Sequence, residues 1–152
     1  MSNWPADVGR GTLPCVTVID SDDPKSLLHR WFEAGDSGNL DAFDDLLHED
    51  VVVHAPLGLA TNGREAEKAV WKAALQGVPD ILHEIQETVL AGSTIAARVV
   101  VTGTHRGVFV GLPATGKRFK INQATFVHVL DGKAAEIWEV ADTASLLKQL
   151  GA

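Results

Sequence analysis

The first half of the chain has the spacing of apolar residues that is typical of helices. Asp23-Pro24 has the form of an N-cap followed by proline at the first helical position, and apolar residues then recur at helical spacing as far as Gly38. The same spacing returns over 39–47 and over 65–75. On the last of these helices we expect Trp71 to lie beside an inward face made of Ala66, Ala69, Val70, Ala73 and Ala74. Between the second and third helices, the β-branched run 51–56 predicts a short strand that Pro56 ends.

From residue 81 onward the hydrophobic period changes to two. We expect strands at 81–90, 94–106, 117–130 and 133–141, followed by a final helical turn. Asp131-Gly132 is a strong signal for a tight hairpin. Helices followed by a long antiparallel meander predict an α+β fold, in which helices cover one face of the sheet. Strands of this length twist and bend, so we expect a cone that encloses a cavity.

Length and charge narrow the class of protein. The 152 residues fit one domain, which we place at 21–152, with 1–20 as an N-terminal arm. A net charge of −7 argues against a nucleic-acid partner or an anionic membrane surface. No apolar run approaches the length of a membrane helix. Cys15 is the single cysteine and no signal-peptide pattern precedes it, so we expect a cytoplasmic protein.

The spacing of histidines and cysteine does not fit a metal site. The six histidines and one cysteine form no His-x-His, His-Glu-x-x-His or Cys-pair motif. The glycines of 103–107 are not followed by the helix that a nucleotide fingerprint requires. We therefore expect chemistry without a metal or other cofactor, and a catalytic mechanism based on proton transfer.

Glu139 is the strongest candidate for that transfer. On its strand, Ala135, Ile137, Glu139 and Ala141 share one face. A carboxylate among small apolar neighbours loses hydration, which raises its pKa and suits it to act as a general acid or base. Arg98, on a neighbouring strand, could pair with Glu139 or hold a developing oxyanion. The alternative is a structural ion pair, or a carboxylate that points to solvent.

The remaining candidates would line the cavity. We expect a mostly flat and aliphatic wall with few hydrogen-bonding groups, made of Trp31, Trp71, Val100, Gln123, Thr125, Val127 and Ile137. Such a wall fits a small hydrophobic ring or carbonyl compound better than a sugar or phosphate. The two tryptophans could equally be ordinary core residues between helix and sheet.

Several motifs resemble those of the SnoaL-like polyketide cyclases, in the nuclear-transport-factor-2-like superfamily. The resemblance runs from about Lys25 to Gly151 and is carried by four segments: residues 31–41 (WFEAGDSGNLD), 103–107 (GTHRG), 111–118 (GLPATGKR) and 138–142 (WEVAD). It implies a cone-shaped α+β fold. The superfamily contains cyclases, isomerases, epoxide hydrolases, dehydratases and binding modules, so the fold alone does not define a reaction.

The resemblance also implies roles for individual residues. Glu139 stands where the cyclases hold the aspartate that acts as general acid/base in an aldol ring closure, and Thr125 stands where they hold a partner histidine. His54 is at a position that often gives a polar side chain to the pocket mouth. Superfamily epoxide hydrolases resemble the chain at Arg98, but Val100 replaces their second aspartate. The chain contains no tyrosine, which the ketosteroid isomerases and these hydrolases use.

Two hypotheses follow. The first is a cofactor-free enzyme, a cyclase-type lyase or isomerase, in which Glu139 removes a proton next to a carbonyl while Arg98 or His54 stabilises the oxyanion. The second is a non-catalytic module that binds a hydrophobic ligand, and an epoxide-hydrolase-like enzyme is a further alternative. A deep pocket containing Glu139 favours the first. Under both the enzyme and the binding-module hypothesis, we expect a homodimer that packs sheet against sheet through Phe126 and Trp138.

Overall fold

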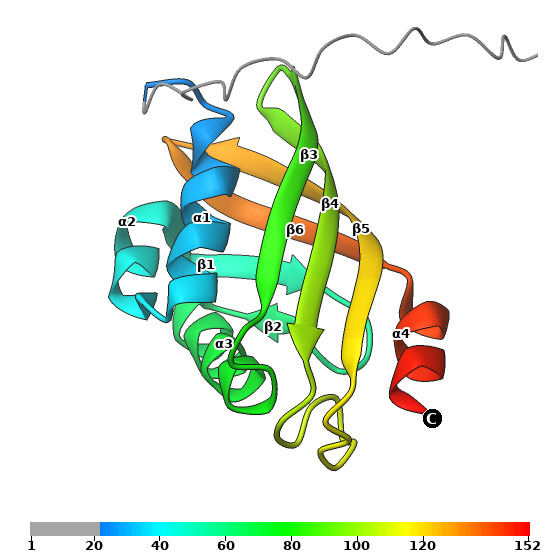
Figure 1. Cartoon of the computed structure of the whole chain (residues 1–152). Coiled ribbons are helices and arrows are strands. Elements are labelled where there is room, and N and C mark those ends of the chain that lie inside the picture. The colour runs from blue at the N-terminus through cyan, green and yellow to red at the C-terminus, as the bar shows by residue number, and fades with distance from the viewer. Residues whose placement is uncertain (1–21) are drawn as a thin grey trace, which may run out of the picture.

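The computed structural model describes residues 22–152, which form a curved sheet with helices packed inside its bend (Figure 1). The arm expected at 1–20 lies outside the described residues. Helices α1 (Ser26–Ser37), α2 (Phe43–Leu46) and α3 (Arg64–Gly77) gather on one side of the sheet, and α4 (Thr143–Leu150) follows the last strand. The predicted α+β fold is therefore confirmed. No helix in 22–152 is long and apolar enough to cross a membrane.

The sheet has six strands in the order β2-β1-β6-β5-β4-β3. Their bounds are β1 Leu47–His54, β2 Thr61–Asn62, β3 Leu82–Ala91, β4 Thr94–Thr104, β5 Arg118–Leu130 and β6 Lys133–Ala141. The four predicted long strands are all present, and Asp131 and Gly132 both have positive φ in the hairpin between β5 and β6. The sheet is not wholly antiparallel, because β1 pairs parallel to β6.

Helix α1 begins at Ser26 after Lys25, so the predicted start with Asp23 as the N-cap is wrong. The end of α1 and the start of α4 follow the predicted glycine and the capping side chain. Gly38 ends α1 in the left-handed conformation, with φ of 78°. The Asp142 side chain accepts a hydrogen bond from the backbone N–H of Ser145 at 3.0 Å and so caps α4. The helix expected over 39–47 is shorter than predicted. A 3₁₀ turn, Leu40–Ala42, leads into one turn of α2, and the strand β1 already begins at Leu47.

Alternation along the strands decides which residues face the core. On β4 the buried set is Ile95, Ala97, Val99 and Val101, while Arg98 is exposed and Val100 only partly buried. The inner face of the sheet packs against α1, where Leu28, Trp31 and Phe32 are almost fully buried. This apolar packing supplies most of the driving force for folding.

The inward face predicted for α3 is only partly right, because Val70 and Ala74 face the interior and the other three alanines do not. Ala66, Ala69 and Ala73 are exposed, whereas Glu67 and Trp71, four residues apart, are buried. A large side chain buries more apolar area than alanine, so the helix turns Trp71 toward the sheet, and Ala66, Ala69 and Ala73 are left facing solvent. This rotation brings a second carboxyl group into the interior.

Candidate functional site

A cavity of about 90 Å³ lies between α3, the inner face of the sheet and α4. Its wall is mostly apolar, with Ile81, Val101, Phe119, Ile121 and Leu146 among the lining side chains. The polar groups are few and come from different elements: Glu67 on α3, His83 on β3, Gln123 on β5, Glu139 on β6 and Thr143 on α4. A dry wall with a few converging polar groups is typical of a small-molecule site.

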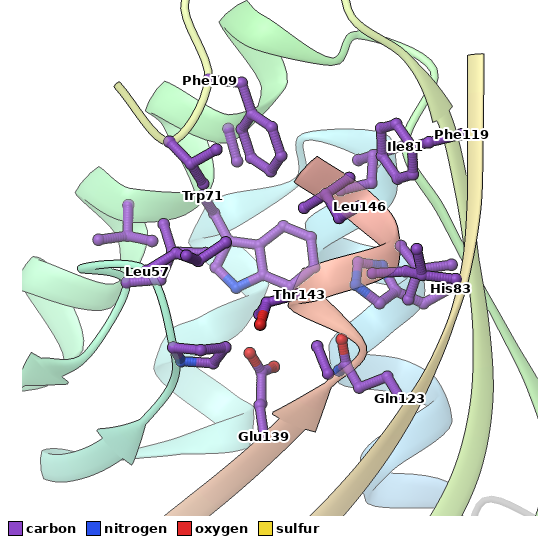
Figure 2. A pocket seen from close by; sticks show the side chains of 18 of the residues that line it. Leu57, Trp71, Ile81, His83, Phe109, Phe119, Gln123, Glu139, Thr143 and Leu146 are labelled. Carbon is purple, nitrogen blue, oxygen red and sulfur yellow. The ribbon is translucent and has the colours of Figure 1, made fainter. Parts of the chain in front are cut away.

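Glu139 points into this cavity. Figure 2 shows its carboxylate directed toward Trp71 and Thr143, beside Gln123. The strand geometry explains this direction, because Ile137, Glu139 and Ala141 share the inner face of β6 as predicted. Only Ala135 departs, since a bulge opposite Val129 buries Ala134 instead. Glu139 is partly buried as a whole residue and is one of the residues that line the cavity.

The surroundings of Glu139 favour its neutral form. Burial raises the pKa of Glu139 to about 8, and the nearby charge of Glu67 adds to the increase. Among the described residues, the structure gives its carboxyl group no hydrogen-bond donor and no paired cation. At neutral pH the group is therefore mostly a carboxylic acid that is poised to exchange a proton.

Glu67, a second carboxyl group in the cavity wall, is held by two hydrogen bonds. The Thr61 hydroxyl donates a hydrogen bond to one carboxylate oxygen at 2.5 Å, and the Trp71 indole N–H donates to the other at 3.0 Å. Burial raises the pKa of Glu67, while these two hydrogen bonds oppose the increase. Since both oxygens are occupied by protein donors, Glu67 serves to position Trp71 and to influence Glu139 through its charge.

Trp71 owes its place in the wall to a glycine on α1. A Cβ atom added to Gly35 would lie 2.5 Å from the Trp71 ring, which is closer than carbon atoms can approach. Trp71 also contacts Trp31 and Phe43 edge to face, at centroid distances of 5.8 and 6.1 Å. The indole is thus fixed between α1, α2 and Glu67.

His83 is one of the polar lining groups that the sequence interpretation missed, together with Glu67 and Thr143. Its Nδ1 lies 2.7 Å from Asp36 Oδ1, and its backbone N–H donates to Asp36 Oδ2 at 2.8 Å. The imidazole stacks on Phe32 at 4.5 Å with an interplanar angle of 6°. The signal was present in the sequence, because His83 alternates with Ile81 and Ile85 and so belongs to the inward face of β3.

Three of the predicted site residues do line the cavity, namely Trp71, Gln123 and Glu139. Four others are buried core that does not reach it: Trp31, Thr125, Val127 and Ile137. Thr125 lies opposite Glu139 in the sheet register and accepts a hydrogen bond from the Gln123 side chain at 3.1 Å. It therefore orients Gln123 without lining the cavity.

The placement expected for Arg98, His54 and Val100 is wrong, because all three lie on the outer face of the sheet. Arg98 is exposed and lies 3.7 Å from Glu87. His54 is exposed, stacks on Trp138 at 5.1 Å and contacts Glu136 at 2.7 Å. Strand alternation is the cause: Val51 and Val53 take the inner positions on β1, as Val99 and Val101 do on β4.

The loop between β4 and β5 closes one end of the cavity and is fixed by His105. This histidine is fully buried, and its ring nitrogens lie 3.0 Å from the Thr115 hydroxyl and 3.2 Å from the Leu112 carbonyl. The loop places Phe109 and Val110 in the wall. Within residues 22–152, no three His, Cys, Asp or Glu side chains cluster as metal ligands.

The fold and cavity together define a cone-shaped α+β protein with an interior acid. Comparison with known proteins gives the family. The family model of SnoaL-like polyketide cyclases matches residues 25–150. The chain therefore belongs to the SnoaL-like polyketide cyclase family, and the resemblance noted from its motifs is confirmed.

Two cyclases of Streptomyces are similar over most of their length. Nogalonic acid methyl ester cyclase of Streptomyces nogalater is 30% identical over 121 residues, which cover 78% of this chain and 90% of that protein. Aklanonic acid methyl ester cyclase DnrD of Streptomyces peucetius is 30% identical over 131 residues, covering 82% and 88%.

Solved structures show the same fold. Wild-type IdmH from Streptomyces antibioticus superposes with a TM-score of 0.74 at 31% identity, over 86% of this chain and 99% of IdmH. TsrD from Streptomyces laurentii superposes with a TM-score of 0.78 at 26% identity, over 88% and 98%.

Proposed function

We propose that this protein closes a ring in a small hydrophobic polyketide-like carbonyl compound by an intramolecular aldol reaction, with Glu139 as a proton-transferring group. The observation that carries the proposal is the Glu139 carboxyl, which points into an apolar cavity without a paired cation or hydrogen-bond donor among the described residues. In this reaction a proton leaves the carbon next to one carbonyl, and that carbon attacks a second carbonyl. The oxygen of the second carbonyl then gains a proton. No electrons are gained or lost, so no redox cofactor is needed.

The cavity size limits how a substrate can bind. Drug-sized ligands occupy about 300–1,000 Å³, and the cavity of about 90 Å³ holds only part of such a molecule. We infer that the reacting end enters beside Glu139 and that the rest lies at the mouth. Leu57 and Leu59 line the cavity there, and Leu57 is 38% exposed.

The proposal can be tested with the two methyl esters named by the relatives. Nogalonic and aklanonic acid methyl esters would be incubated with the wild type and with Glu139→Gln, and ring closure followed by chromatography at unchanged mass. We expect turnover by the wild type and a loss of about 10²-fold or more in the variant. Glu49→Gln, at an exposed position on β1, is the matched control. Equal turnover by wild type and Glu139→Gln would remove Glu139 from the mechanism.

Non-catalytic binding is the second candidate, and the small cavity is the observation that favours it. The same experiment separates the two functions, since Trp71 in the wall reports on binding through its fluorescence. A ligand that changes this fluorescence but is never converted would identify a binding module. The epoxide-hydrolase-like alternative is less well supported, because Arg98 does not reach the cavity.

A further inference from the structure

His83 and Glu139 face the same cavity from different strands, β3 and β6 (Figure 2). Within residues 22–152, Asp36 is the group bonded to the His83 ring, and only Nδ1 makes that bond. An ionised carboxylate can only accept hydrogen bonds, so the ring nitrogen that contacts Asp36 must be the donor. The ring proton of His83 is therefore on Nδ1. Nε2 is then the nitrogen with the free lone pair, which is the tautomer required of a general base.

We propose that His83, held by Asp36, accepts the proton from substrate carbon and that Glu139 donates the proton to the acceptor carbonyl oxygen. This assignment rests on the proposed ring closure and fixes the direction of both proton transfers. His83 and Glu139 are catalytic residues in this scheme, and Asp36 is a positioning residue.

The step balances as follows. The C–H bond next to one carbonyl breaks, its proton goes to His83 Nε2, and the electron pair forms the new C–C bond to the second carbonyl carbon. The oxygen of that carbonyl takes the proton of the Glu139 carboxyl. His83 is left as an imidazolium beside the Asp36 carboxylate, and Glu139 as a carboxylate. The two groups return to their starting forms by exchange with water after product leaves.

The position of the pair in the fold supports this return. Asp36 and His83 also line a separate groove between α1 and the start of β3, together with His29 and Glu33. His83 therefore borders both the cavity and the groove, so a proton taken inside can leave through the groove side. The Asp36 side chain is only 11% exposed and that of His83 only 8%, which keeps the pair in a fixed geometry.

The test separates the two half-reactions. In D₂O, the wild type is expected both to exchange the acidic C–H of the two methyl esters for deuterium and to close the ring. His83→Phe, which keeps the stack on Phe32, should lose both by about 10²-fold or more. Glu139→Gln should lose ring closure but keep exchange. The opposite pattern, with exchange lost only in Glu139→Gln, would make Glu139 the base and overturn the assignment. His128→Gln, on the outer face of β5, is the control.

A second measurement does not depend on turnover. Long-range ¹H–¹⁵N spectra of the full chain should show neutral His83 with its proton on Nδ1, and Asp36→Asn should shift the tautomer toward Nε2. Asp41→Asn, an exposed position, should not. A wild-type His83 protonated on Nε2 would overturn the proposal. If the wild type neither exchanges nor cyclises either ester, the proposed function fails, and the tautomer still shows whether His83 is built as a base.

Discussion

Glu139 and Glu67 lie on the wall of one apolar cavity, and burial together with the charge of Glu67 raises the pKa of Glu139 to about 8. The two carboxyls differ in their partners. Glu67 accepts hydrogen bonds from Thr61 and Trp71, whereas the structure gives Glu139 none among the described residues. Two nearby carboxyl groups in different environments take different roles. Glu139, which has no hydrogen-bond donor among the described residues, is therefore the carboxyl group available for proton exchange.

This raised pKa makes folding stability depend on pH. Below about 4.5, Glu139 is protonated in both the folded and unfolded states and has no effect. As pH rises from about 4.5 to 8, the unfolded chain releases this proton and the folded protein keeps it, so the free energy of unfolding falls. Above about 8 both states have released the proton, and the free energy of unfolding falls no further on account of Glu139. At about 1.4 kcal/mol per pKa unit, we expect Glu139→Gln to be more stable than the wild type by a few kcal/mol at pH 8.

Urea unfolding at pH 4.5 and pH 8 measures this difference. The gap between Glu139→Gln and wild type should nearly vanish at the lower pH, and Glu49→Gln should show no such change. A gap of equal size at both pH values would mean that Glu139 titrates normally and is in contact with bulk water.

Replacing Glu67 should lower the pKa of Glu139. Glu67→Gln removes a like charge from the cavity and retains a side chain that can accept from the Trp71 indole. The titration of the Glu139 carboxyl carbon, followed by ¹³C NMR, should move to lower pH in this variant. Glu65→Gln on the exposed side of α3 is the matched control. An unchanged midpoint would show that burial alone sets the pKa of Glu139.

The two tryptophans should respond differently to mutation. Trp31 is buried in the core, and its indole N–H has no hydrogen-bond partner among the described residues. Trp31→Phe should therefore cost about 1–2 kcal/mol of stability with KM unchanged. Trp71→Phe removes both cavity wall and the hydrogen bond to Glu67, so kcat/KM should fall. A higher KM in Trp31→Phe would show that Trp31 contributes to substrate binding.

Much of this architecture was predictable because local patterns agree with the fold. The strands from residue 81 onward, the Asp131-Gly132 turn and the inner face of Glu139 all follow from a period of two and simple turn chemistry. Arg98 could also have been placed correctly. The alternate set on its strand, Ile95 to Val101, is wholly apolar and had to be the inner face.

Other features depend on contacts between distant segments. Nothing local shows that Glu67 is buried, because its partner Thr61 lies in a two-residue strand and the row of alanines on α3 presents a competing apolar face. The Asp36–His83 pair joins α1 to β3 and requires the tertiary fold. The parallel pairing of β1 with β6 likewise links segments that are far apart in the sequence.

The outer-face residues should be dispensable for chemistry. Arg98→Ala and His54→Ala remove side chains whose contacts are with Glu87 and with Glu136 and Trp138, on the side of the sheet away from the cavity. We expect kcat/KM to stay within about twofold of wild type, since exposed substitutions usually have small effects. A loss of about tenfold or more in either purified variant would place that residue in the mechanism.

The outer face also carries the expected dimer contact. Phe126 is 40% exposed, pairs with Trp138 across the strands, and lies near Val140, which is 63% exposed. Exposed apolar side chains on one sheet face favour self-association. Light scattering at micromolar concentration should give a dimer for the wild type and a monomer for Phe126→Glu. Leu90→Glu is the control, because Leu90 is 39% exposed but pairs with Ile95 on the inner side of the register. A wild-type monomer would rule out the dimer, and a Phe126→Glu dimer would place the interface elsewhere.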